Sequence, residues 1–281
     1  MTEVPIFFNI HFILFSMYLT ILAIGDIVGK PGRKILEQKL NNFIKQQKID
    51  FCLANAENSA SGSGITIDIA NKLFSYGVSI ITMGDHVWKR KEIYDWMKTE
   101  KRIIRPANYS PLAHGRGFVA LETLKGNIVG VINLLGRVFM KPVDCPFRAA
   151  DNAVEALSKI TNIMIVDMHA EATSEKVAMG WYLDGKVSAV VGTHTHIQTA
   201  DERMLPGGTG YITDLGMTGP HESVIGRRVD CVLKSMVTQV PVRYEIADKD
   251  VRIEGVIITI NCSTGKAEKI KRIRIPEDVS D

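Results

Sequence analysis

The chain has 281 residues, of which 46% are apolar and 23% are charged, and it carries a net charge of +3 at pH 7. These proportions are those of an ordinary globular protein and argue against a disordered or fibrous chain. The lysines and arginines are scattered rather than clustered, so we predict no stable nucleic-acid partner.

The first apolar run, residues 5–25, is long enough for a membrane span or for the apolar part of a signal segment. Three details argue against both interpretations. Asn9 and His11 interrupt the run, no Lys or Arg precedes it, and no small-residue cleavage site separates it from Asp26. We therefore predict that the protein does not associate with a membrane.

The second part of this run, Tyr18 to Gly25, is typical of a strand buried on both faces in a parallel sheet. Met17 stands directly before it. We interpret residues 1–16 as an N-terminal extension that results from a start assigned too far upstream. Residues 17–281 are then expected to form a single domain.

Farther along the chain, short apolar runs alternate with amphipathic stretches, a pattern typical of βαβ units with a parallel or mixed sheet flanked by helices. The expected strands are 18–25, 51–55, 79–83, 118–122, 128–134, 163–167, 189–191 and 209–213. Helices are expected at 33–47, 66–76 and 149–160. The tail resembles antiparallel strands at 240–246, 251–260 and 267–275.

The four cysteines lie far apart and include no C-x-x-C pair: Cys52, Cys145, Cys231 and Cys262. This spacing indicates neither a zinc knuckle nor a disulfide framework. Free buried thiols in a reducing compartment are the simpler interpretation, and we predict a cytoplasmic protein.

Polar side chains follow several of the expected strands. They are Asp26, Glu57, Asn58, Asp85, His86, His169, His194 and His196. Each one alone is more simply explained as a helix cap, a turn former or a structural histidine. However, the carboxyl ends of strands in an α/β sheet form one rim where ligands bind, and four of the seven histidines belong to this set. The joint pattern therefore predicts one site.

The glycines around Asp26 resemble a phosphate-binding loop but do not fit one. Gly25 and Gly29 are separated by three residues where four are required, and Pro31 stands where Ser or Thr would bind Mg²⁺. With Gly32 they do not match the dinucleotide spacing either. We expect them to form a tight turn that aims Asp26 inward.

His194 and His196 are the most informative local signal, because residues i and i+2 of an extended segment point the same way. Carboxylate and imidazole ligands suit Mn, Fe or Zn better than Ca. The candidate set is large enough for two ions, which can clamp the attacking and leaving oxygens of a phosphate ester about 3.5–4 Å apart.

Seven motifs occur in order along the chain: GDIVGKPGR at 25–33, NAEN at 55–58, ITMGDHVW at 81–88, RPAN at 105–108, HAEATSEK at 169–176, GTHTHIQTAD at 192–201 and YITDLGMTGP at 211–220. With these motifs the sequence resembles the calcineurin-like metallophosphoesterases, and within them closely resembles the YmdB-like bacterial phosphodiesterases. The resemblance runs from about Met17 to near the carboxyl terminus.

This resemblance implies two mixed β-sheets packed together and flanked by helices, a closed homo-oligomer, and a centre of two Fe or Mn ions, with Zn or Mg as alternatives. It implies hydrolysis of 2′,3′-cyclic or 3′,5′-cyclic nucleotides. The implied ligands are Asp26 and His196 for one ion, Glu57 as a bridge, and Asp85, His169 and His194 for the other. Asn58 would be a ligand or contact the phosphate, and His86 would be the general acid.

The expected mechanism follows from charge. Metal ions depress the pKa of water, so a hydroxide that bridges two ions is a strong nucleophile at neutral pH. It would attack phosphorus in line with the leaving oxygen, to which His86 would donate a proton.

Two positions depart from the family pattern. Asp85 stands where a Gly-Asn-His triplet has Asn, and Lys89 stands where relatives carry an acid that orients the His86 loop. The formal charges of two divalent ions, a hydroxide and three carboxylates cancel, whereas Asn at 85 would leave a net positive charge. We therefore predict tight metal retention and slow turnover.

Two other functions remain open at this stage. One is a catalytically weakened regulatory or scaffolding protein that retains a metal site. The other is a zinc amidohydrolase, which the order of the ligands disfavours. Structural roles are expected for Arg137 and for the motif residues Arg105, Asn108, Glu171 and Ser174 to Lys176, with Thr173 or Ser174 as a helix cap.

Overall fold

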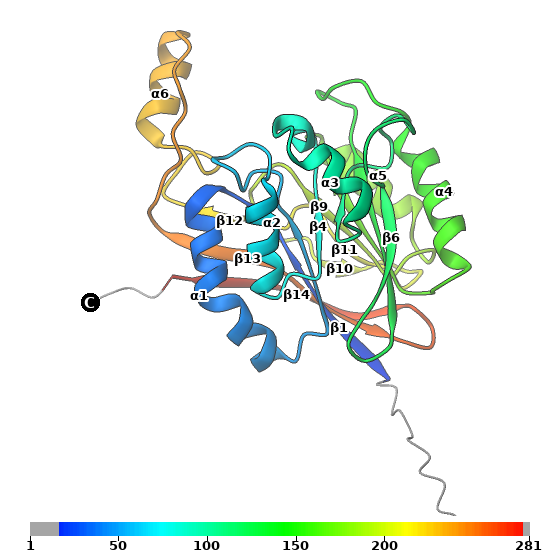
Figure 1. The fold of residues 1–281 in the computed structure, drawn as a ribbon. Coiled ribbons are helices and arrows are strands. Elements are labelled where there is room, and N and C mark those ends of the chain that lie inside the picture. The colour runs from blue at the N-terminus through cyan, green and yellow to red at the C-terminus, as the bar shows by residue number, and fades with distance from the viewer. Residues whose placement is uncertain (1–16, 278–281) are drawn as a thin grey trace, which may run out of the picture.

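Two β-sheets face each other across an apolar layer in the computed structural model, which describes residues 17–277 (Figure 1). The interpretation of residues 1–16 as an extension falls outside this range. The larger sheet has eight strands: β2 (Asp26–Ile27), β12 (Met217–Pro220), β13 (Val251–Asn261), β1 (Tyr18–Ile24), β3 (Phe51–Asn55), β4 (Ile80–Thr82) and β5 (Ile103–Ile104) in spatial order, with β14 (Ala267–Pro276) paired to β13.

The second sheet has six strands: β10 (Arg203–Met204), β11 (Gly210–Ile212), β9 (Ala189–Thr193), β8 (Met164–His169), β7 (Ile128–Leu135) and β6 (Phe118–Glu122). Both sheets are mixed. In the larger sheet β1 runs parallel to β3 and antiparallel to β13. In the smaller sheet β7 runs parallel to β8 and antiparallel to β6. The predicted arrangement of two mixed sheets is therefore confirmed.

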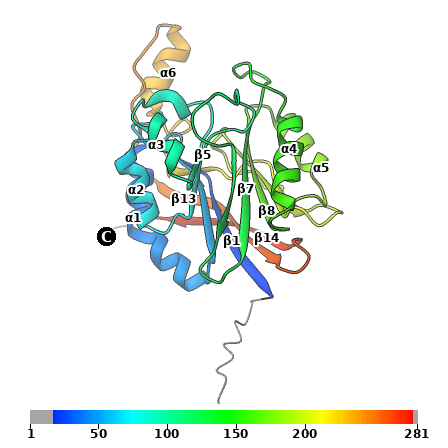
Figure 2. The same cartoon turned by 45° about the vertical axis from the view of Figure 1, so that its right-hand side comes forward.

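Helices cover the outer faces of both sheets, as Figures 1 and 2 show. Against the larger sheet pack α1 (Gly29–Gln47), α2 (Ile67–Ser75) and α3 (Ile93–Thr99), and against the smaller sheet pack α4 (Pro146–Ser158) and α5 (Thr173–Tyr182). A 3₁₀ turn, Val87–Lys89, and α6 (Val229–Thr238) complete the set.

Strand β1 illustrates how the sequence produces these layers. Ile21 and Ala23 point into the core between the sheets, whereas Leu22 and Ile24 point to the helices. Successive side chains of a strand point to opposite faces, so a continuous apolar run buries both faces. The predicted buried strand at this position is confirmed.

Helix α1 begins at Gly29, four residues before the predicted start at Arg33. Pro31 lies in its first turn, where a backbone N–H has no partner within the helix, so the proline does no harm there.

Gly25 serves close packing rather than the expected tight turn. A Cβ at this position would lie 2.1 Å from the carbonyl oxygen of Gly216, so any side chain would push β12 away. With that strand in place, Asp26 pairs with Met217 in parallel register, and its N–H donates to Gly216 O at 3.1 Å. Asp26 is thereby held on a two-residue strand.

The predicted strand at 240–246 is wrong. Residues 228–245 instead form a projection, here called the α6 arm, that stands away from the two sheets in Figures 1 and 2. Only Ile246 forms an isolated bridge, with Arg227. Gln239 ends α6 in a left-handed conformation, and Pro241 has no N–H to offer a neighbouring strand.

No helix within residues 17–277 is long and apolar enough to cross a membrane. The four cysteines are free thiols, but the prediction that they are buried holds only for Cys52. Cys145, Cys231 and Cys262 are partly exposed.

Candidate metal centre

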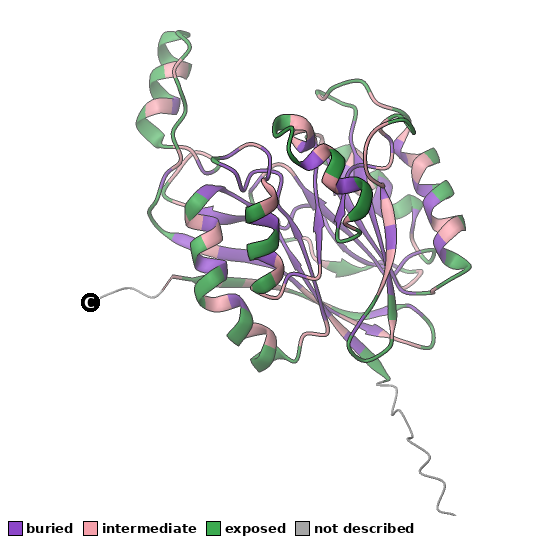
Figure 3. Cartoon of the chain, viewed as in Figure 1, coloured by how far each residue is buried: buried purple, intermediate pink, exposed green. Residues whose placement is uncertain are grey.

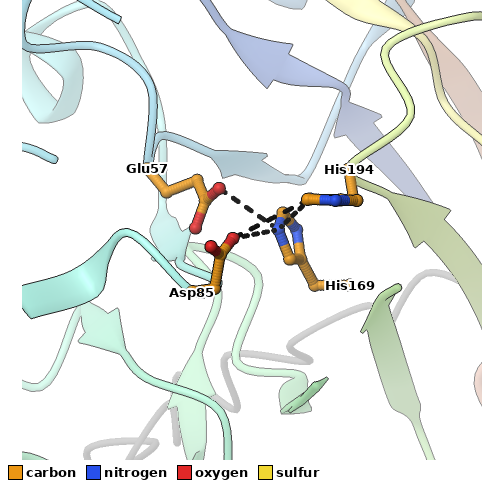
Figure 4. A group of neighbouring side chains, drawn as sticks. All are labelled: Glu57, Asp85, His169 and His194. Atoms are coloured by element: carbon orange, nitrogen blue, oxygen red, sulfur yellow. Dashed lines mark hydrogen bonds and ion pairs between the residues drawn. The ribbon is translucent and has the colours of Figure 1, made fainter. Parts of the chain in front are cut away.

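Four predicted ligands converge at the carboxyl ends of the strands. Glu57, Asp85, His169 and His194 each offer one ligand atom, and these atoms all lie within 4.8 Å of one another (Figure 4). The side chains come from β8 and from the loops that follow β3, β4 and β9. Oε1 of Glu57 lies 3.2 Å from Nε2 of His169, although the two residues are far apart in the sequence.

Three further predicted residues lie beside this group. Oδ1 of Asp26 lies 3.7 Å from Nε2 of His196, and Oδ2 accepts the backbone N–H of His194 at 3.0 Å. The amide nitrogen of Asn58 lies 3.2 Å from Nε2 of His196. All of the predicted metal ligands therefore belong to one connected cluster.

His86 lies at the open side of the cluster, with its side chain 30% exposed. Its Nδ1 lies 2.9 Å from Oδ1 of Asn58 and 3.3 Å from Oε1 of Glu57, and its backbone N–H donates to Oε2 of Glu57 at 2.9 Å. Because both neighbours of Nδ1 are acceptors, Nδ1 carries a proton. Nε2, the other ring nitrogen, lies 3.8 Å from Oδ2 of Asp85.

Hydrogen-bond partners orient the two buried imidazoles. Nδ1 of His169 donates to Oγ1 of Thr193 at 2.9 Å, and that hydroxyl donates to Asp167 at 2.6 Å. Nδ1 of His196 donates to the carbonyl of Ile225 at 3.0 Å. Each Nε2 is then directed at the carboxylates, which is how partners of a metal-ligating histidine select its tautomer.

Three buried carboxylate oxygens of the cluster accept no hydrogen bond: Oδ1 of Asp26, Oε1 of Glu57 and Oδ1 of Asp85. Burial raises the pKa of Asp26 to about 6. Burial also opposes ionisation of Glu57 and Asp85, but interactions with His169 outweigh it and lower the pKa of both carboxyl groups. Buried carboxylates gathered this closely are costly without positive charge among them, so the arrangement favours a bound cation.

The two neighbouring imidazoles support the same conclusion. Nδ1 of His194 lies only 3.0 Å from Nε2 of His169. Burial opposes the charged form of His169, yet the carboxylates, Glu57 first, raise its pKa well above its usual value. Burial and the His169 charge lower the pKa of His194 to about 3. The residues present thus fit a metal ion, whose positive charge would take the place of the proton that charges His169.

The His-Thr-His segment is not extended, contrary to the expectation from its spacing. His194 and His196 have φ angles of 98° and 64°, in the left-handed region. Asp214 holds the residue between them: one carboxylate oxygen accepts from the N–H of Thr195 at 3.2 Å and from its hydroxyl at 2.6 Å. The buried ammonium of Lys176 lies 2.7 Å from the same oxygen.

Most of the structural roles predicted for other residues agree with the contacts. The guanidinium of Arg105 donates to the carbonyls of Pro106 and His114, and Asn108 exchanges two hydrogen bonds with the backbone of Leu135. The backbone N–H of Arg137 donates to Glu175.

Two details about helix α5 differ from the prediction. The helix begins at Thr173, but neither Thr173 nor Ser174 caps it, because the capping position is Ala172, which makes no side-chain bond. Glu171 was expected to be structural, yet its Oε2 lies 3.1 Å from Nε2 of His194. Its position two residues after His169 was the only signal that placed it near the site.

A pocket of about 450 Å³ opens onto the cluster. One part of its lining consists of Glu57, Asn58, His86, Glu171, His194, Thr195 and His196, and the other of Val224, Ile225, Arg227, Val232, Met236 and Tyr244. Sequence reasoning missed the second group entirely, because no motif or periodicity connects these residues to the ligands.

The chain is similar to known proteins along most of its length. A family model described as YmdB-like protein matches residues 22–273. The chain is 45% identical over 260 residues to the 2′,3′-cyclic-nucleotide 2′-phosphodiesterase of Bacillus subtilis, covering 92% of this chain and 98% of that protein.

Two crystal structures have the same fold. A hypothetical protein from Thermus thermophilus superposes with a TM-score of 0.87 and 36% identity, over 92% of this chain and 100% of that one. A protein described as a novel phosphatase from Mycoplasma pneumoniae superposes with a TM-score of 0.86 and 33% identity, over 93% and 94%. The motifs, the fold and these similarities agree, and the chain belongs to the YmdB-like protein family.

Proposed function

We propose that this protein is a metal-dependent phosphodiesterase that hydrolyses cyclic nucleotides, 2′,3′-cyclic monophosphates above all and 3′,5′-cyclic ones as a second class. One observation carries the proposal: the carboxylates of Asp26, Glu57 and Asp85 face the converging imidazoles of His169, His194 and His196 in one cluster. The 45% identity to a 2′,3′-cyclic-nucleotide 2′-phosphodiesterase supports the substrate class.

The contacts support the division of ligands that the resemblance implies. Asp26 and His196 would hold one ion of Fe or Mn, and Asp85, His169 and His194 the other. Glu57 would bridge the two ions. Such ions would supply a nucleophile by lowering the pKa of water and would stabilise the charge that develops on the phosphate.

The protein's own side chains would orient the substrate and deliver a proton. His86 lines the pocket, and its Nε2, 3.8 Å from Oδ2 of Asp85, can carry the proton for the leaving oxygen. Asn58 and Glu57 orient the His86 ring through Nδ1, so the missing acid at position 89 does not leave this imidazole without a partner. Asn58 also reaches His196 and can contact the phosphate.

Hydrolysis under controlled metal content tests the proposal. The purified protein, stripped with chelator and reloaded with Mn²⁺ or Fe²⁺, is expected to cleave bis(p-nitrophenyl) phosphate and 2′,3′-cyclic nucleotides. The apoprotein is expected to cleave neither. Elemental analysis before stripping identifies the native ions. A protein that retains its metal yet cleaves no phosphodiester would favour the regulatory or scaffolding alternative.

The carboxylate at position 85 is expected to limit turnover. We predict that Asp85→Asn raises kcat at saturating metal and weakens metal binding, because the variant removes one negative charge next to an anionic substrate. Oδ1 of Asp85 lies 3.6 Å from Nε2 of His169, so this charge is inside the cluster. An unchanged or lower kcat at saturating Mn²⁺ would contradict the prediction.

Assembly and location complete the proposal. A homo-oligomer and a cytoplasmic location, both predicted above, can be tested by light scattering on the purified protein and by cell fractionation.

A further inference from the structure

The pocket next to the metal cluster has two unlike sides. The polar side consists of the cluster residues and their neighbours. The other side is apolar except for one cation and includes Val232, Met236 and Tyr244 of the α6 arm. A volume of about 450 Å³ lies within the range of roughly 300–1,000 Å³ of small-molecule sites, which are mostly apolar with a few polar groups.

The apolar side chains of the α6 arm are mostly exposed, so packing in the core does not account for them. Met236 is 67% exposed and Tyr244 is 44% exposed, although both line the pocket. Most of the arm is exposed in Figure 3, and it adds only Val232 to the buried residues. An aromatic ring and a polarisable thioether beside a polar centre form a surface suited to a flat, aromatic ligand.

Arg227 indicates that the ligand of this pocket is negatively charged. Its Nη2 donates to the carbonyl of Gly62 at 2.7 Å, which anchors the side chain in the pocket lining. Burial lowers the pKa of the guanidinium, and no carboxylate within residues 17–277 forms an ion pair with it. A half-buried cation without an acidic partner favours an anionic ligand, and its fork of donors suits phosphate oxygens.

We infer that Tyr244 and Met236 form a nucleoside subsite, in which the base of the substrate stacks on the α6 arm while its phosphate faces Arg227 and the metal cluster. This inference rests on the proposed function and deepens it. The arm is then a specificity element that selects nucleotides among phosphodiesters. Base stacking on an aromatic side chain is sequence-tolerant, so purine and pyrimidine substrates should both benefit.

Two substrates that differ only in the base test this assignment. One is 2′,3′-cyclic AMP, and the other is methyl β-D-ribofuranoside 2′,3′-cyclic phosphate, which has the same ring phosphate without a base. The full-length protein loaded with Mn²⁺ is expected to prefer the nucleotide. Tyr244→Ala should lower kcat/KM for the nucleotide about tenfold, mainly through KM, the size of effect that loss of one stacked base produces.

The base-free substrate and two further variants serve as controls. Tyr244→Ala should leave kcat/KM for the base-free substrate unchanged, and Tyr244→Phe should retain the preference because the ring remains. Val237→Ala, at a 79% exposed position of the α6 arm that does not line the pocket, should change neither value. Circular dichroism checks that each variant is folded.

The outcomes separate the subsite from the function. Equal kcat/KM for both substrates, or an equal loss on both with Tyr244→Ala, overturns the subsite and leaves the phosphodiesterase intact. A change in oligomeric state with unaltered substrate preference assigns the arm to self-association instead, and also overturns it. If the wild-type protein cleaves neither substrate, the proposed function fails and the subsite fails with it.

Discussion

Glu57→Gln is expected to lower phosphodiesterase turnover about a thousandfold and to reduce the metal content of the purified protein. The carboxylate is completely buried and lies between the imidazoles of His86 and His169, at 3.3 and 3.2 Å. The contribution of metal ions to such reactions is worth several kcal/mol, and about 1.4 kcal/mol corresponds to a factor of ten in rate. Turnover of 2′,3′-cyclic AMP and elemental analysis measure the two effects.

A surface glutamate provides the matched control. Glu155→Gln makes the same chemical change on α4, where the side chain is 76% exposed, and should leave turnover and metal content unchanged. Without metal, Glu57→Gln should lower the melting temperature, because it removes the carboxylate that pairs with the buried His169 ring at 3.2 Å. Wild-type metal content and activity in this variant would refute the bridging role of Glu57.

Asp214→Ala is expected to destabilise the protein by about 3–5 kcal/mol, since it leaves the Lys176 ammonium buried without a counter-charge, with only the Thr195 hydroxyl at 3.0 Å. Both side chains are almost completely inaccessible, and their charged atoms lie 2.7 Å apart. Chemical denaturation at pH 7 measures the change. The variant should also bind Mn²⁺ more weakly, because Asp214 holds Thr195 between His194 and His196.

A double variant separates stability from positioning. Lys176→Met with Asp214→Leu removes both charges and should recover much of the lost stability, since replacing a buried ion pair by apolar side chains is often close to neutral. Metal binding should remain weak, because Thr195 still lacks its acceptor. The exposed pair Lys159–Glu155, 3.4 Å apart, is the control, and Glu155→Ala there should cost less than about 1 kcal/mol. An Asp214→Ala variant no less stable than this control would refute the prediction.

Local sequence predicted most of the strands for a simple physical reason. A strand buried on both faces needs a short, continuous apolar run, and the runs at 18–25 and 51–55 meet that requirement. The run at 240–246 has apolar residues at alternate positions, which is also typical of a strand, but it contains Pro241. No strand within residues 17–277 pairs with it, and only Ile246 forms a bridge. Composition does not reveal whether a partner strand lies alongside.

The metal cluster was predictable because the strand ends of a parallel sheet meet at one rim. The motifs located every member of the cluster, and the structure brings Glu57 to within 3.2 Å of His169 from a distant part of the chain. The contacts and backbone conformations that hold the ligands in place were not predictable. The Lys176–Asp214 pair and the left-handed conformations of His194 and His196 depend on contacts between different elements.

By itself the sequence determined the layered α/β architecture, the candidate ligand residues and the family, because apolar periodicity and motif order are local properties of the chain. Only the tertiary structure decided which imidazole faces which carboxylate, how the His-Thr-His segment is held, and that the α6 arm lines the pocket. These features depend on distances between side chains that are remote in the sequence, and spacing along the chain does not set such distances.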